Sequence, residues 1–114
     1  MKEEMFLQCW EIVSRMELWF LSNCPFEEMS RGDYMMLNLL TQSANDGKMM
    51  TVTMISDSLK VSKAAISQSI KALKKKEWVK SISDTTDKRK SYIVLTDEGR
   101  KAYEKQRKVI IRNL

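Results

Sequence analysis

Residues 62–104 read SKAAISQSIKALKKKEWVKSISDTTDKRKSYIVLTDEGRKAYE and carry the pattern from which the fold follows. The first part of this segment repeats three apolar residues at helical spacing, namely Ile66, Ile70 and Leu73. The spacing predicts an amphipathic helix over about 62–76 with Ser62 as its cap. The face opposite the apolar stripe is small, polar and basic, and it consists of Lys63, Ala64, Ser67, Gln68, Lys71 and Lys75.

A shorter helix is expected just before this one. Thr51 is a suitable cap for it, and its inward residues are expected to be Met54, Ile55 and Leu59. Only Lys60 and Val61 then separate the short helix from Ser62. A short helix, a tight turn and a longer helix form a helix-turn-helix layout.

The second part of the segment predicts a β-hairpin. The runs 78–82 and 91–95 are rich in β-branched and aromatic residues, and they bracket a polar connector at 83–90. The tip of this hairpin carries three consecutive cations, Lys88, Arg89 and Lys90. A last helix is expected to begin at Thr96-Asp97-Glu98, and its inward residues are Ala102, Val109 and Ile110.

Two further helices are expected before residue 50. The first spans about Met5–Leu21 and ends at Asn23-Cys24-Pro25, because proline cannot continue a helix and disfavours helical geometry in the residue before it. The second is expected to start with Asp33 as its cap and to end near Asn45-Asp46-Gly47. Its packing residues are Tyr34, Met35, Leu37, Leu39 and Leu40.

The first helix is apolar around most of its circumference. One stripe consists of Met5, Cys9, Ile12, Met16 and Trp19, and a second consists of Phe6, Val13 and Phe20. Leu7, Trp10, Leu18 and Leu21 lie beside these stripes. Such a helix must be covered on more than one side, either by a partner subunit or by the chain's own core. A partner subunit is the simpler explanation, because one small domain offers little surface for this purpose.

The composition excludes most catalytic chemistry. The chain has 114 residues, of which 43% are hydrophobic and 31% charged, the balance of one globular domain. It has no His and only Cys9 and Cys24, so it cannot form a zinc finger, a His-based triad or a His-dependent metal site. No Gly-rich phosphate loop is present either. The aspartates Asp57, Asp84 and Asp87 are scattered among expected turns, where they would cap or brace. We therefore expect no enzyme, no metal and no cofactor.

The sequence shows neither a membrane-spanning segment nor a signal peptide, and these features bear on where the protein is expected in the cell. Its apolar runs are far shorter than the roughly 18 residues that a bilayer span requires. The start, MKEEMFLQCW, carries acidic charge and has no small-residue cleavage site, unlike a signal peptide. We expect a bacterial-type cytoplasmic protein with no membrane partner.

Charge is unevenly distributed along the chain. Residues 1–50 hold four basic and eight acidic residues, a net charge of −4, whereas residues 51–114 hold sixteen basic and seven acidic residues, a net charge of +9. A concentrated basic surface attracts polyanions, of which nucleic acid is the commonest. A solvated basic face without a partner is the alternative.

The segment 62–104 resembles the MarR family of winged helix-turn-helix transcription regulators. The resemblance is strong over roughly residues 50–104, whereas residues 1–49 are compatible with it only in the layout of their helices. Besides the recognition helix, the resemblance rests on an Asp-x-Arg wing tip at Asp87 and Arg89 and on a Leu-Thr-x-x-Gly helix start at Leu95, Thr96 and Gly99. It implies a mainly α fold with a small β-hairpin wing (α+β), that is, a winged helix-turn-helix with flanking dimerisation helices. The implied regions are a dimerisation helix at 1–24, a DNA-binding domain at 33–96 with its recognition helix at 62–76 and its wing at 78–95, and a C-terminal dimerisation helix at 97–114.

The resemblance also implies a function. Members of the family are homodimers that bind pseudo-palindromic duplex DNA and usually repress transcription until an effector loosens them. The residues expected at DNA are Ser62, Lys63, Ala64, Ser67, Gln68, Lys71, Lys88, Arg89 and Lys90, with Asp87 orienting the wing. Among them, Gln68 is suited to adenine and Ala64 to a thymine methyl group, and Arg89 is expected in the minor groove. The expected dimerisation residues are Met5, Cys9, Ile12, Met16, Trp19, Val109 and Ile110.

Three features depart from the family pattern. Glu77 stands where the family usually has Gly after the recognition helix, so either a left-handed cap is strained there or the helix ends differently. Lys60 stands where helix-turn-helix turns often favour Gly. Relatives typically continue for another helix beyond residue 114, which leaves the first and last helices to supply most of the dimer interface.

The sequence leaves alternatives open on whether the protein senses an oxidant or a small molecule and on whether its partner is DNA or a protein. Cys9 either packs structurally or senses peroxide, as a Cys in this helix does in some relatives, although no nearby basic residue favours a thiolate. Methionines either belong to the core or line a pocket for a small apolar effector, and those concerned include Met35, Met36, Met49, Met50 and Met54. The alternative function is a winged-helix module that binds a protein without sequence-specific DNA binding. Salt separates the two functions, because DNA affinity falls steeply as salt rises.

Overall fold

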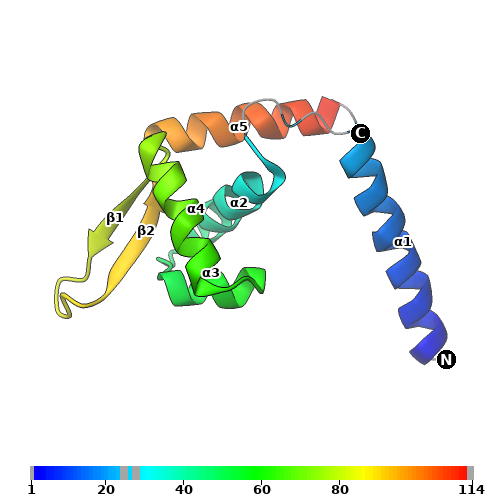
Figure 1. The fold of residues 1–114 in the computed structure, drawn as a ribbon, viewed down its shortest axis with the longest axis horizontal. Helices are drawn as coiled ribbons and strands as arrows, with labels where there is room; N and C mark the ends of the chain where they lie inside the picture. Colours follow the sequence, from blue (N-terminus) through cyan, green and yellow to red (C-terminus); the bar gives the residue numbers. More distant parts are fainter. Residues whose placement is uncertain (1, 24–25, 27–28, 113–114) are drawn as a thin grey trace.

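The computed structural model describes residues 2–23, 26 and 29–112 (Figure 1). Over these residues the elements follow in the order α1 Lys2–Asn23, α2 Arg31–Asn45, α3 Val52–Leu59, α4 Lys63–Lys75, β1 Val79–Ser83, β2 Ser91–Leu95 and α5 Asp97–Arg112. The expected class, mainly helical with one small hairpin, is confirmed.

Side-chain caps set where the central helices begin. Thr51 Oγ1 accepts a hydrogen bond from the N–H of Met54 at 3.2 Å, and Ser62 Oγ accepts one from the N–H of Ala65 at 3.2 Å. Both caps agree with the sequence prediction.

The cap predicted for α2 was wrong. Ser30, and not Asp33, is its N-cap, because the Ser30 hydroxyl accepts the N–H of Asp33 at 3.1 Å. Asp33 therefore lies in the first turn, where its negative charge suits the positive end of the helix dipole. The helix ends as predicted, with Asp46 as its C-cap and Gly47 at a φ of 72°.

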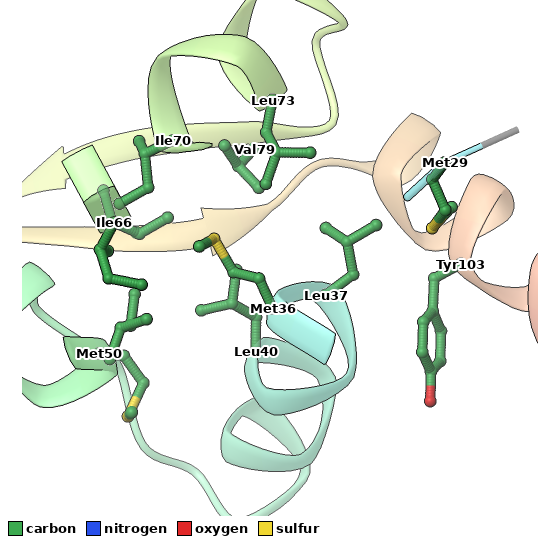
Figure 2. Close-up of a cluster of buried hydrophobic side chains, with 12 residues drawn as sticks. Met29, Met36, Leu37, Leu40, Met50, Ile66, Ile70, Leu73, Val79 and Tyr103 are labelled. Atoms are coloured by element: carbon green, nitrogen blue, oxygen red, sulfur yellow. The ribbon is translucent and has the colours of Figure 1, made fainter. Parts of the chain in front are cut away.

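The core lies where α2, α3, α4 and the hairpin meet (Figure 2). It consists of Met29, Met36, Leu37, Leu40, Met50, Ile55, Ile66, Ile70, Leu73, Val79, Ile93 and Tyr103. The apolar stripe predicted for α4 is thus buried. Met35 and Met54 were expected inward but are 46% and 40% exposed. Each precedes a fully buried or nearly buried neighbour, and one residue step rotates a side chain by about 100° around a helix.

The hairpin is antiparallel and in a single register from Val79 opposite Leu95 to Ser83 opposite Ser91. It is joined to the segment before α3, because the N–H of Ile93 donates to the carbonyl of Met50 at 2.8 Å. Its tip projects away from the helices (Figure 1). The wing is therefore anchored at its base and free at its tip.

Two non-glycine residues take left-handed backbone at the ends of the helix-turn-helix helices. Lys60 has a φ of 57° and Glu77 a φ of 61°. After Glu77 the N–H of Trp78 donates to the carbonyl of Leu73 at 3.0 Å, the bond that closes a Schellman cap. Of the two alternatives for Glu77, the left-handed cap is the one present. In the helix-turn-helix turn the Ser56 hydroxyl donates to the carbonyl of Val61, a contact that sequence reasoning missed.

Helix α5 packs against α2 through residues that the periodicity did not single out. Tyr103 and Gln106 are buried, whereas the expected Ala102, Val109 and Ile110 are only half-buried. The Tyr103 hydroxyl donates to Asn38 Oδ1 at 2.6 Å, and its ring stacks on Tyr34 with 5.1 Å between centroids.

Helix α1 stands apart from the other elements (Figure 1). The described side chains of both apolar stripes are exposed to solvent in the single chain, with Met5 at 66%, Phe6 at 68% and Ile12 at 59%. The alternative in which this helix threads through its own core is therefore wrong for the described residues. The side chains of Phe20 and Leu21, and the break at Cys24 and Pro25, lie outside the described residues.

Candidate nucleic-acid interface

Helix α4 presents one buried and one exposed face. Ile66, Ile70 and Leu73 are at most 4% exposed, which fixes the opposite side of the helix toward solvent. Every residue predicted for that side is exposed, as is the cap residue Ser62, and the predicted residues are Lys63, Ala64, Ser67, Gln68, Lys71 and Lys75. The structure thus places them on the exposed side of α4, a helix that has no acidic residue between Lys63 and Lys75.

At the wing tip, Asp87 holds Arg89 by two hydrogen bonds. Asp87 Oδ1 accepts from the backbone N–H of Arg89 at 3.0 Å and from its Nε at 3.3 Å. The Arg89 side chain is nevertheless 92% exposed. The neighbours Lys88 and Lys90 are also exposed. The carboxylate therefore orients a guanidinium whose remaining donors face solvent.

A second carboxylate braces the base of the same loop. Asp84 Oδ1 accepts from the N–H of Thr86 at 3.1 Å and from its hydroxyl at 3.3 Å. Asp84 Oδ2 accepts from the Tyr92 hydroxyl at 3.1 Å. Hydrogen bonding, first from the backbone N–H of Thr86, lowers the pKa of Asp84, and the bond to Asp84 raises the pKa of Tyr92. The carboxylate is therefore ionised at neutral pH and accepts three hydrogen bonds from neutral donors.

The aspartates were expected to cap or brace, and Asp84 does so, but Asp57 lies inside α3 instead of in a turn. The contact with Tyr92 was missed. The spacing Asp84-Thr85-Thr86 is typical of a turn in which an aspartate bonds to the backbone two residues on. No comparable local pattern points to the tyrosine in β2.

The wing and the helix-turn-helix share one surface. A hollow of about 570 Å³ lies between the first turn of α3 and the wing tip. It is lined by Thr51, Val52, Thr53, Met54, Arg89, Lys90 and Ser91. Cations from the wing thereby adjoin the start of the helix-turn-helix.

The described residues lack two other kinds of site. No group of three or more His, Cys, Asp or Glu lies close enough within them to hold a metal ion. No helix formed by them has the length and apolar character needed to cross a membrane.

The methionines divide between core and surface. Met36 and Met50 belong to the core, whereas Met35, Met49 and Met54 are 40% to 50% exposed. Cys9 is a free, exposed thiol on α1. Met49 and Met50 line a partly open hollow of about 290 Å³, and Met35 and Met36 line another of about 220 Å³.

Residues 28–90 match the family model described as the MarR family. The chain belongs to the MarR family. The matched region covers α2, the helix-turn-helix and the wing as far as its tip, which are the elements that carry the exposed basic surface. The family is one of transcription regulators, and its fold supports a DNA-binding regulator.

Solved structures share the fold of this MarR-family chain. It is similar to the adhesin competence repressor AdcR of Streptococcus pyogenes, with a TM-score of 0.64, 22% identity and coverage of 90% of this chain and 70% of that one. It is similar to a mutant MarR from E. coli complexed with operator DNA, with a TM-score of 0.66, 20% identity and coverage of 73% and 56%.

A third similar structure is the PcaV transcriptional regulator from Streptomyces coelicolor in complex with its natural ligand, with a TM-score of 0.69, 19% identity and coverage of 92% and 71%. No curated protein matches the sequence of the chain. The chain thus spans little more than half the length of the E. coli MarR structure and about 70% of the other two. The family and the fold class predicted from residues 62–104 are confirmed.

Proposed function

We propose that this chain is a sequence-specific DNA-binding regulator that acts as a homodimer on a pseudo-palindromic operator and represses transcription. One observation carries the proposal. The wing-tip cations Arg89 and Lys90 line one hollow with the first turn of α3, the helix that precedes α4 in the helix-turn-helix, and the outward face of α4 is exposed and has no acidic residue. A helix and a hairpin arranged in this way fit the adjacent major and minor grooves of duplex DNA.

Helix α4 is the reading element in this proposal. Gln68 pairs with an adenine through its amide, and Ala64 contacts a thymine methyl group. Ser62, Ser67 and Lys71 contact phosphates, which set the register of the helix without reading sequence. Lys63 lies at the start of the same face and adds positive charge beside the groove.

The wing is the second contact. Arg89 inserts into the minor groove, where a narrow groove concentrates negative potential. Asp87 orients Arg89 and does not touch DNA itself, since its Oδ1 atom already accepts two bonds from Arg89. Lys88 and Lys90 lie at the phosphate backbone on either side.

Dimerisation covers the exposed helix α1. The proposed interface combines α1 with the end of α5 and uses Met5, Cys9, Ile12, Met16, Trp19, Val109 and Ile110. In regional terms, residues 1–24 and 97–114 dimerise and residues 33–96 bind DNA. A small apolar effector, where one acts, binds between these helices and the DNA-binding lobe, and the protein works in the cytoplasm.

The experiment is a fluorescence-anisotropy titration of the DNA upstream of the chain's own gene against shuffled DNA. Gln68→Ala and Arg89→Ala should each weaken binding by roughly 5- to 150-fold, the effect of losing about 1–3 kcal/mol of groove contact. Gln68→Ala should also relax base preference at one position in each half-site. Arg31→Ala at the start of α2, outside the regions assigned to dimerisation and DNA binding, removes the same charge as Arg89→Ala and should change little. Wild-type affinity in both variants would contradict the groove assignment.

A protein-binding winged-helix module is the second candidate, and the exposed apolar surface of α1 favours it. A hydrophobic interface of this kind changes little with salt. DNA binding that neutralises about six to ten phosphates loses roughly three to five decades of affinity between about 50 and 200 mM salt. The salt dependence of binding therefore decides between the two functions.

A further inference from the structure

We propose that Asp84 and Tyr92 form a clamp that fixes the shape of the wing tip and so aims Arg89 at DNA. Asp84 is then a positioning residue, which acts through Arg89 and does not contact DNA. The inference rests on the proposed function, since it concerns how the wing of a DNA-binding regulator is held.

The clamp uses both oxygens of one carboxylate. Asp84 Oδ1 turns the chain by accepting the N–H and hydroxyl of Thr86 at 3.1 and 3.3 Å. Asp84 Oδ2 accepts the Tyr92 hydroxyl at 3.1 Å. Tyr92 belongs to β2, where it pairs with Ile82 across the hairpin. The same carboxylate therefore ties the outgoing side of the loop to the returning strand.

The loop beyond the clamp has few other restraints. Two backbone bonds close it, from the Asp84 N–H to the Lys90 carbonyl and from the Lys90 N–H to the Asp87 carbonyl, each at 3.0 Å. Arg89 is restrained by its hydrogen bonds to Asp87, and its side chain is otherwise 92% exposed to solvent. The direction of its guanidinium consequently follows the backbone at Asp87, which comes directly after the turn that Asp84 makes with Thr86.

The clamp and simple electrostatics predict opposite effects for the loss of Asp84. Its carboxylate is a negative charge in a wing that meets phosphates, so removing it should strengthen DNA binding if charge alone mattered. If the carboxylate holds Arg89 in place, removing it should weaken binding, because the side chain must then be ordered on association. Tyr92→Phe tests the same link without any change in charge.

The test uses two labelled duplexes of equal length, one with a central A-tract and one composed of G·C pairs. The narrow minor groove of the A-tract is the preferred seat of an inserted arginine. Asp84→Ala and Tyr92→Phe should each lower affinity for the A-tract duplex about three- to tenfold, the effect of re-ordering one flexible side chain. Asp57→Ala, which removes another exposed carboxylate, should not lower it.

Repeating both substitutions in an Arg89→Ala background separates positioning from a general structural effect. The clamp predicts no further loss in that background and an unchanged thermal unfolding midpoint for Tyr92→Phe. In the free protein, the Arg89 Nε–H signal in an NMR spectrum should shift in Tyr92→Phe as its bond to Asp87 loosens.

Three outcomes would overturn the clamp. The first is wild-type A-tract affinity in both single variants, and the second is a loss of equal size in the Arg89→Ala background. The third is an Arg89→Ala variant that binds both duplexes as tightly as the wild type does. This third result marks a failure of the proposed function as well, and it also removes the clamp's role in DNA binding.

Discussion

Replacing Glu77 with glycine is expected to stabilise the protein. Glu77 holds a φ of 61° directly after α4, and a non-glycine residue in this region is strained by roughly 1–2 kcal/mol. Glycine relieves that strain but loses about 0.5–1 kcal/mol more conformational entropy on folding. The net gain for Glu77→Gly is therefore about 0.5–1 kcal/mol.

The main contacts of the junction survive this substitution. The carbonyl of residue 77 accepts the Thr96 hydroxyl, and the N–H of residue 77 donates to the Lys74 carbonyl at 2.9 Å. Neither contact involves the Glu77 side chain, which is exposed. The hairpin should leave the recognition helix at the same angle, and DNA affinity should be retained.

Urea unfolding followed by circular dichroism measures the effect, with Glu77→Ala as the matched control. Alanine also removes the carboxylate, which is unfavourable near a helix C-terminus, but it keeps the Cβ atom that causes the strain. We expect Glu77→Gly to exceed Glu77→Ala by roughly 0.5–1 kcal/mol with an unchanged m-value. Equal stability of the two variants would refute the strain argument.

Three further predictions concern other parts of the molecule. Gly99→Ala should destabilise the fold by about 3 kcal/mol, because an added Cβ would lie 2.0 Å from the Trp78 carbonyl oxygen. Gly32→Ala is the control and should be tolerated, because its added Cβ would lie 3.9 Å from the nearest atom. Equal urea midpoints for the two variants would contradict this prediction. Ile12→Glu places a charge on the 59% exposed apolar face of α1 and should give monomers with poor DNA affinity, so an unchanged dimer in light scattering would argue against the proposed interface. Burial, and then the Tyr103 hydroxyl, raise the pKa of Tyr34 from 10.0 to about 12. As the pH rises, Tyr34 therefore ionises in the unfolded chain before it ionises in the folded one. The free energy of unfolding should fall from near pH 10 until about pH 12, and Tyr34→Phe should lack this fall. A Tyr34 hydroxyl that titrates near pH 10 in the folded protein, followed by ultraviolet absorbance, would disprove the prediction.

The recognition helix could be predicted because its signals are local and agree with one another. The apolar spacing of Ile66, Ile70 and Leu73 and the cap at Ser62 all specify the same helix and the same exposed face. The same kind of signal misled at α2, where Asp33 was predicted as the cap but the hydroxyl of Ser30, three residues earlier, accepts the N–H of Asp33. Runs of methionine were likewise ambiguous, since Met35 and Met36 differ by a single step around the helix.

The conformation at Glu77 could be predicted only as far as two alternatives, and Lys60 stands where Gly is often favoured; the structure shows left-handed backbone at both. Other features depend on contacts between distant residues and could not be predicted. The Asp84 to Tyr92 bond crosses the hairpin, and the Tyr103 to Asn38 bond joins residues 65 positions apart. Local periodicity carries no information about such pairs.

The salt dependence of DNA binding by the full chain tests the DNA-binding proposal most directly. Five cations of each subunit lie at the proposed interface, namely Lys63, Lys71, Lys88, Arg89 and Lys90. If each neutralises one phosphate, log affinity should fall against log salt with a slope of about −4.5 for each subunit and about −9 for a dimer. Anisotropy titration at several salt concentrations, with light scattering on the same sample, should show steep, sequence-selective binding by a dimer. Weak binding that is equal on upstream and shuffled DNA and insensitive to salt would contradict DNA-binding regulation and point to α1 as a protein-binding surface.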